Sequence, residues 1–292
     1  MDIQIKSNLF AISAVLFWST VATAFKLTLE GMNYAQLLFY SSIFSSAVLF
    51  LFARRNGRSA REILFQKDFF LKNLSLGLLN PFFYYLVLFK AYSLLPAQEA
   101  QPLNYTWPIA ISIFSVIFLD QKLTIKTIAG LLLAFFGVAV IATRGDLFSL
   151  EFHSFFGVIL AAGSSLIWAS FWILNLKDKR ENGEKLFGAF FTGTIFTAIY
   201  ISLFDSFKLN DYSFIFGAAY IGLFEMGITF FLWMKALQLS VNKAKTSTLA
   251  YLSPFISLIF ISLILKETLF YSSIIGLVLI VGGILIQRIG RN

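Results

Sequence analysis

"LNYTWPIAISIF" (103–114) is the stretch of sequence that decides the fold, because it has an echo, "LAYLSPFISLIF" (249–260). The leucine, the tyrosine, the proline and the closing Ile-Phe recur in the same order without a gap, 146 residues apart in a chain of 292. A pattern that repeats at half the length of the chain predicts an internal duplication. We therefore expect a first unit over residues 1–146 and a second over residues 147–292.

The composition is that of a membrane protein. Hydrophobic residues make up 58% of the chain, the mean hydropathy is +0.80, and charged residues are only 13%, about half the usual share for a soluble domain. A helix that crosses the lipid bilayer needs about 20 apolar residues. On this basis we predict ten spans, over residues 8–27, 34–53, 71–92, 98–119, 126–143, 155–176, 186–205, 213–237, 244–265 and 271–289.

Lysine and arginine are distributed unevenly between the two sides of the predicted membrane. An even number of spans puts both termini on one side, and most of the 23 Lys and Arg residues fall in loops on that side. The basic residues on the other side are Lys26, Lys90, Arg144, Lys208 and Lys266. Because loops rich in Lys and Arg stay in the cytoplasm, we expect a multi-pass protein of the cell inner (plasma) membrane with both termini cytoplasmic.

Each predicted half contains five helices, which is an odd number, so the second half enters the membrane from the opposite side. The sequence therefore predicts an all-α membrane protein with ten transmembrane helices, arranged as two five-helix inverted-topology repeats around a central cavity. Secondary transporters are often built in this way, with the substrate near the middle of the membrane between the repeats.

Three stretches resemble a known family. The first is residues 233–286, with a Lys-Ala-Leu, the second repeat proline, a Lys-Glu-Thr turn and a glycine-rich last helix; the others are "FWSTVATAFKLTLEG" (17–31) and "LNYTWP" (103–108). Together they resemble the EamA-type, ten-helix members of the drug/metabolite transporter (DMT) superfamily. The last two stretches are similar to the aromatic amino-acid exporter branch. The resemblance implies export of amino acids or related metabolites.

Glu225 is the most informative single residue. It lies near the middle of the predicted span 213–237, where a carboxylate costs roughly 2.5–3.5 kcal/mol on insertion scales. Such a residue usually faces a cavity or a partner, so we expect it to bind a substrate amine or to couple transport to protons. The alternative is a structural, hydrogen-bonded glutamate.

Aromatic and amide side chains in the predicted spans supply the other candidates for substrate binding. Aromatic walls with a few polar groups are typical of small-molecule sites, and packing against lipid and neighbouring helices is the alternative for each aromatic ring. Trp18 and Trp168 are repeat mates, as are Tyr105 and Tyr251. The full set of cavity candidates is Trp18, Asn80, Tyr84, Asn104, Tyr105, Trp107, Trp168, Glu225 and Tyr251.

The repeated prolines, Pro108 and Pro254, are predicted to kink their helices and to serve in gating. A proline in a helix interior costs about 3 kcal/mol, because it removes a hydrogen bond and clashes with the preceding turn. Its recurrence in both halves favours a role in the fold or in its motion over a tolerated kink.

Other classes of function fit poorly. The chain has no cysteine and a single histidine, so we predict no catalytic residues, no metal site and no cofactor, and a membrane-embedded enzyme is disfavoured. The net charge of +8 reports loop orientation and not nucleic-acid binding. The expected partners are the lipid bilayer, a small-molecule substrate and protons, with no obligatory protein partner. A sugar-phosphate, nucleotide-sugar or drug exchanger of the same superfamily is the alternative, although phosphate would require fixed cations.

Overall fold

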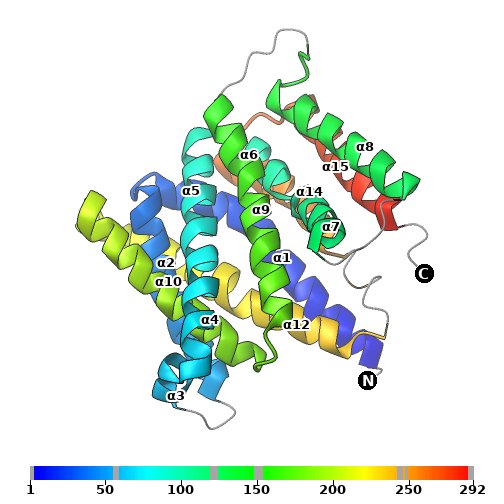
Figure 1. Ribbon diagram of the computed structural model, residues 1–292. Helices are drawn as coiled ribbons and strands as arrows, with labels where there is room; N and C mark the ends of the chain where they lie inside the picture. Colours follow the sequence, from blue (N-terminus) through cyan, green and yellow to red (C-terminus); the bar gives the residue numbers. More distant parts are fainter. Residues whose placement is uncertain are drawn as a thin grey trace.

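The computed structural model of the chain describes residues 3–54, 59–118, 124–147, 154–241, 246 and 249–288, and all regular structure in them is helical (Figure 1). The first half contains α1 (Ile3–Leu29), α2 (Tyr34–Ala53), α3 (Ala60–Phe65), α4 (Lys67–Gly77), the π-helix η2 (Leu78–Phe83), α5 (Tyr84–Leu94), α6 (Ala97–Asn104), α7 (Trp107–Phe118) and α8 (Ile125–Ala142). The second half contains α9 (Phe155–Lys177), α10 (Asn182–Phe204), η3 (Tyr212–Phe214), α11 (Ile215–Tyr220), η4 (Ile221–Ile228), α12 (Thr229–Leu239), η5 (Leu249–Tyr251), α14 (Leu252–Phe260), η6 (Ile261–Leu265) and α15 (Tyr271–Arg288).

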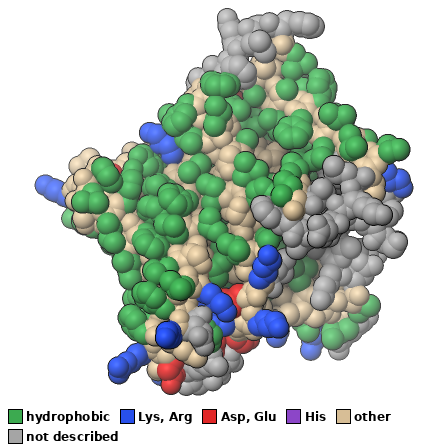
Figure 2. Space-filling model, in the orientation of Figure 1, with side chains coloured by type: hydrophobic (Ala, Val, Ile, Leu, Met, Phe, Trp, Pro, Cys, Tyr) green, Lys and Arg blue, Asp and Glu red, His purple; other side chains and the backbone are tan. Residues whose placement is uncertain are grey.

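The chain is an all-α membrane protein. In the described residues six helical segments are long and apolar enough to cross a membrane: Ile3–Leu29, Tyr34–Ala53, Phe69–Leu94, Phe155–Asn175, Asn182–Phe204 and Tyr212–Leu239. Figure 2 shows hydrophobic side chains over most of the visible face, with many of the charged ones toward its lower end and its edges. Leu132, Phe216 and Leu263 are among the large apolar side chains that lie exposed, as expected for a surface in contact with lipid.

One short helix, α3, lies between the predicted spans 34–53 and 71–92. It begins with a capping box, in which the Ser59 hydroxyl accepts the backbone N–H of Glu62 at 3.3 Å and the Glu62 carboxylate accepts the N–H of Ser59 at 2.8 Å. A Ser-x-x-Glu pattern before an apolar run is a helix-start signal. Hydropathy does not reveal this helix, because α3 is too short to span a membrane.

The pair α8 and α15, whose residues are mates in the sequence repeat, makes the most extensive helix contact and lies at one side of the molecule (Figure 1). A methyl group added at Gly137 would lie 2.6 Å from the carbonyl oxygen of Gly276, and one added at Gly276 would lie 2.7 Å from that of Gly137. Further along the same pair of helices, a methyl group added at Gly283 would lie equally close to the carbonyl oxygen of Gly130. Residue numbers rise along one helix as they fall along the other, so these mates run antiparallel.

A second pair of mates, α2 and α10, packs in the same manner. The hydroxyls of Tyr34, at the start of α2, and Tyr200, near the end of α10, lie 3.3 Å apart. The rings of Phe50 and Phe187, at the opposite ends of the same helices, have centroids 5.1 Å apart. This pair is therefore also antiparallel.

Two of the predicted spans are broken where polar residues and proline occur. In η2 the backbone of Asn80 leaves the helix, with φ −147° and ψ 119°. The predicted span 98–119 is divided into α6 and α7 by a turn at Tyr105 and Thr106.

Pro108 and Pro254 lie in the first turns of α7 and α14. The first turn of a helix needs no N–H donor, so proline is tolerated there without loss. Pro108 therefore follows the turn at Tyr105 and Thr106, whereas Pro254 follows the 3₁₀ turn η5, which runs directly into α14.

Candidate substrate-binding site

A cavity lies between helices of the two halves. It is lined by Trp18, Val21 and Phe25 of α1, Tyr84, Leu88 and Tyr92 of α5, Gln101 and Asn104 of α6, Tyr105, Trp107 of α7, Trp168 of α9, and Glu225 of η4. The structure thus brings together most of the candidates that the sequence predicted. The space open to the centres of water molecules is about 60 Å³, which is room for a few waters, so a larger ligand requires the helices to move apart.

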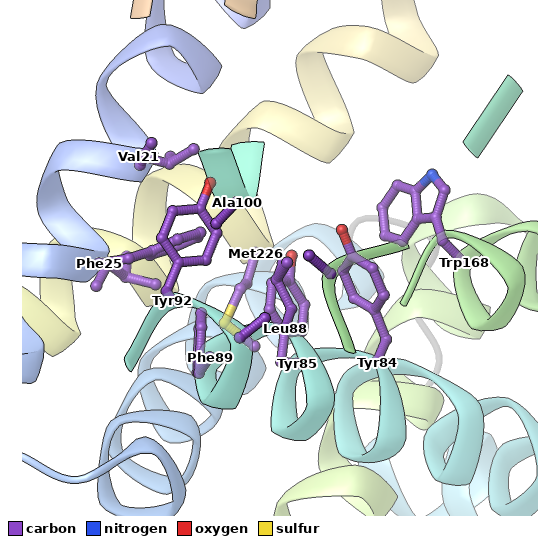
Figure 3. Close-up of a cluster of buried hydrophobic side chains, with 14 of the residues drawn as sticks. Val21, Phe25, Tyr84, Tyr85, Leu88, Phe89, Tyr92, Ala100, Trp168 and Met226 are labelled. Carbon is purple, nitrogen blue, oxygen red and sulfur yellow. The ribbon is translucent and has the colours of Figure 1, made fainter. Parts of the chain in front are cut away.

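Aromatic rings form the walls of this cavity. Tyr84 and Trp168 pack with ring centroids 4.7 Å apart, and Phe25 and Tyr92 pack edge to face at 5.1 Å. In Figure 3 tyrosines stand in a row along α5, with Val21 and Phe25 of α1 near one end and Trp168 near the other. Such a wall offers apolar and stacking surface to a ligand.

The amide of Asn104 joins three helices by hydrogen bonds. The Tyr84 hydroxyl donates to its Oδ1 at 3.3 Å, and its Nδ2 donates to the Ser164 hydroxyl at 2.8 Å. A neighbouring bond, from the Thr106 hydroxyl to that of Ser165 at 3.1 Å, ties the turn between α6 and α7 to α9. Asn104 is therefore largely occupied in holding the broken helix in place.

Glu225 lies in the π-helical segment η4, a type of helix that is frequent at functional sites. It is 7% exposed, and the Tyr85 hydroxyl donates to its Oε1 at 3.1 Å. Its Oε2 has no hydrogen-bond partner among the described residues. A buried carboxylate oxygen left open in a cavity can accept a hydrogen bond from a ligand or hold a proton.

Gln101 is a lining residue that the sequence analysis missed. It is 2% exposed, and neither its Oε1 nor its Nε2 has a hydrogen-bond partner in the described part of the chain. The signal that could have found it is its place one helical turn before Asn104, within the polar run "QEAQPLN" (98–104) of a membrane protein.

Two of the predicted residues, Asn80 and Tyr251, do not line this cavity. Asn80 is fully buried at the break in η2, and Tyr251 is 4% exposed in η5. Both prolines are buried in the first turns of their helices. The candidates thus divide into a group around the cavity and a group outside it.

A charged cluster joins the turn between α9 and α10 to α4. Arg180 binds Asp178, with Nη2 2.6 Å from Oδ2, and donates from Nη1 to the Asn73 amide oxygen at 2.6 Å. Burial acts to raise the pKa of Asp178, but the hydrogen bonds and charge of Arg180 outweigh it and hold the pKa below its ordinary value. The cluster ties the two halves together outside the membrane-spanning segments.

At the other end of the helical span 67–94, Lys26 of α1 donates to the backbone oxygens of Tyr92 at 3.0 Å and Leu95 at 3.1 Å. On the same end, Arg144 forms an ion pair with Glu99 at 2.8 Å. The cavity therefore lies between two polar clusters.

An all-α membrane protein with a buried aromatic cavity and unpaired polar groups in it has the architecture of a small-molecule transporter. The sequence matches the EamA-like transporter family over residues 5–143 and 155–288, so the chain belongs to that family. It is a transporter and not an enzyme.

The relatives of this chain include two uncharacterized transporters of Bacillus subtilis (strain 168). YvbV is 28% identical over 65% of this chain and 62% of its own length, and YoaV is 23% identical over 96% of both chains. The aromatic amino acid exporter YddG of Ancylobacter novellus is 25% identical over 54% of this chain and 55% of its own. A solved crystal structure, 22% identical, matches the fold with a TM-score of 0.69 over 97% of this chain and 96% of the other.

Proposed function

We propose that this chain is a secondary transporter that exports amino acids, aromatic ones among them, across the inner membrane by alternating access. The observation that carries the proposal is the unpaired Oε2 of Glu225 in a cavity walled by aromatic rings. An open carboxylate attracts an ammonium group, and the rings suit an apolar or aromatic side chain.

The proposal includes ten membrane-spanning helices arranged as two inverted repeats, over residues 1–146 and 147–292, with both termini in the cytoplasm. The antiparallel packing of α8 on α15 supports the inversion, because repeat mates that enter the membrane from opposite sides must run in opposite directions. The packing of α2 on α10 supports it again. When the two repeats exchange their conformations, the cavity opens to one side of the membrane and then to the other.

The substrate class follows from the charge of the cavity. Glu225 is an acid, and none of the described residues that line the cavity is Lys or Arg. A phosphorylated sugar or nucleotide would need such cations, which disfavours the exchangers of phosphorylated substrates as an alternative. The name of the relative YddG, an aromatic amino acid exporter, points to the same class as the cavity.

Counterflow in proteoliposomes tests this proposal. Vesicles are loaded with unlabelled Phe, Trp, Thr or a sugar phosphate, and the uptake of the matching radiolabelled compound is followed. We expect Phe and Trp to accumulate above empty vesicles and the sugar phosphate to remain at background. Uptake of the sugar phosphate without that of any amino acid would overturn the proposed substrate class.

Glu225 is also the proposed site of coupling to protons. If it exchanges a proton during the cycle, transport by the wild type changes with pH, and transport by Glu225→Gln does not. Tyr85→Phe, which removes only the hydrogen bond to Oε1, is the matched control and should keep a pH dependence. Equal pH profiles for the wild type and E225Q would remove Glu225 from coupling.

A further inference from the structure

Gln101 stands out because a buried amide is normally hydrogen-bonded. Its side chain is 2% exposed and lines the cavity, yet its Oε1 and its Nε2 both lack a partner among the described residues. Leaving both ends of an amide unpaired in a buried site costs stability. Because this amide lines the cavity, a ligand that enters can supply the missing hydrogen bonds.

The contrast with Asn104, three residues later on α6, is informative. Residues three apart lie on the same side of a helix, and both side chains line the cavity. The amide of Asn104 is bonded to Tyr84 and Ser164, whereas that of Gln101 is open. The two neighbours therefore have different tasks: Asn104 fixes the helix, and Gln101 remains available.

Helix α6, which carries Gln101, is tied at both of its ends. The Glu267 carboxylate accepts the N–H of Ala97 at 3.0 Å at the start of α6, and Asn104 is bonded at its end. A helix tied at both ends leaves the backbone of Gln101 little freedom to lose when a ligand binds, which favours affinity.

Glu225 supplies the complementary group. Its Oε2 is an unpaired acceptor in the same cavity, while the Gln101 Nε2 is a donor that is suited to a carboxylate. We propose that Gln101 is a further substrate-recognition residue, whose amide binds the carboxylate of a zwitterionic substrate while Glu225 binds its ammonium group. This inference rests on the proposed function and deepens it, because it requires both charged ends of the amino acid.

Three related compounds distinguish the contact of Gln101 with the substrate carboxylate from the contact of Glu225 with its ammonium group. Phenylalanine has both charged groups, phenethylamine lacks the carboxylate, and 3-phenylpropionate lacks the amine. Binding of each to the purified full-length protein is measured by calorimetry, for the wild type, Gln101→Leu, Gln101→Glu and Glu225→Gln. Thermal unfolding of each variant establishes that it is folded.

We expect Q101L to weaken phenylalanine binding by about tenfold or more, the value of one hydrogen bond to a charged group, and to leave phenethylamine binding unchanged. Q101E, which places a carboxylate against the carboxylate of phenylalanine, should weaken it further and still bind phenethylamine. E225Q should weaken the binding of both phenylalanine and phenethylamine, because each carries an ammonium group. Ser257→Ala is the matched control, since it removes an unpaired buried hydroxyl that does not line the cavity, and it should change none of the three affinities.

Two results would overturn the role of Gln101. One is an unchanged affinity of folded Q101L and Q101E for phenylalanine, and the other is an equal loss of phenylalanine and phenethylamine binding in them. In both cases the wild type still binds phenylalanine, and the proposed function stands. A wild type that binds none of the three compounds would overturn the proposed function and this inference together.

Discussion

The carboxylate of Glu267 accepts the backbone N–H of Ala97 at 3.0 Å, and so ties the turn that follows η6 in the second half to the first turn of α6 in the first half. The same carboxylate also accepts the N–H of Gln98, at 3.4 Å. A negative charge at a helix N-terminus is favourable because it satisfies free N–H groups and faces the positive end of the helix dipole. The helix that carries Gln101 and Asn104 is thus anchored by a residue from the other repeat.

Replacing Glu267 by glutamine keeps the shape of the side chain and removes its charge. We expect E267Q to lower the free energy of unfolding by about 1 kcal/mol, the usual value of a charge at a partly buried helix terminus. Thermal unfolding in detergent measures the change. Glu62→Gln is the control, because Glu62 caps only the short helix α3 and its loss should cost less. An E267Q protein as stable as the wild type would contradict the anchoring role.

Asn104 and Gln101 should respond differently to the loss of their amides. N104A leaves the Tyr84 hydroxyl without its acceptor and removes the bond to Ser164, and a buried group left unpaired costs about 1–3 kcal/mol. Q101L breaks no side-chain hydrogen bond to the residues that the structure describes, and it should leave stability nearly unchanged or raise it. Unfolding of the two variants in a graded detergent series makes the comparison. If Q101L were the less stable variant, the assignment of structural and binding tasks would be reversed.

The contact between α8 and α15 is sensitive to a single methyl group. In Gly137→Ala the new methyl would lie 2.6 Å from the Gly276 carbonyl oxygen, so the helices must move apart, at a cost of about 1–3 kcal/mol. Gly163→Ala is the matched control, because nothing lies within 4 Å of its added methyl, and alanine favours a helix over glycine. We expect the melting temperature to fall for G137A and to hold or rise for G163A.

Acid should loosen the cluster around Asp178. Its pKa is held below its ordinary value, so the stability that it contributes is present above the pKa of the unfolded chain, near 3.9, and is lost as pH falls through the lower folded value. Asp178→Asn removes this contribution at neutral pH and should flatten the loss of stability in acid. Melting temperatures between pH 7 and pH 3 test this, with the exposed Glu30→Gln as control. The same acid slope in D178N as in the wild type would contradict the assignment.

Hydropathy predicted the all-α membrane fold, because the apolar runs are long and the loops between them are short; six of the helical segments among the described residues are long and apolar enough to cross a membrane. The division of the span 98–119 into two helices could be predicted only in part from the sequence. Pro108 indicated that the helix is irregular there, but its position in the first turn of α7 depends on the turn at Tyr105 and Thr106. The helix α3 could have been found from the pattern of Ser59 and Glu62. Local sequence signals are sufficient for α3 and only partly so for the division of the span 98–119.

The pairing of polar atoms in the cavity could not be predicted. The sequence pattern indicated Asn104 as a binding residue and did not indicate Gln101. Both are amides near a proline, so the pattern alone cannot separate them. What separates them is the presence of Tyr84 and Ser164, from α5 and α9, beside Asn104. Contacts between residues far apart in the chain decide which polar group is open, and a single sequence does not contain them.

The central claim, that the cavity holds an amino acid, is tested most directly by substrate protection of a cysteine. The chain contains no cysteine, so Val21→Cys, on the α1 wall of the cavity, is the only thiol in its variant. We expect phenylalanine to slow the reaction of this thiol with a small maleimide in proteoliposomes, and a sugar phosphate to leave the rate unchanged. A rate slowed by the sugar phosphate and unaffected by phenylalanine would contradict the account.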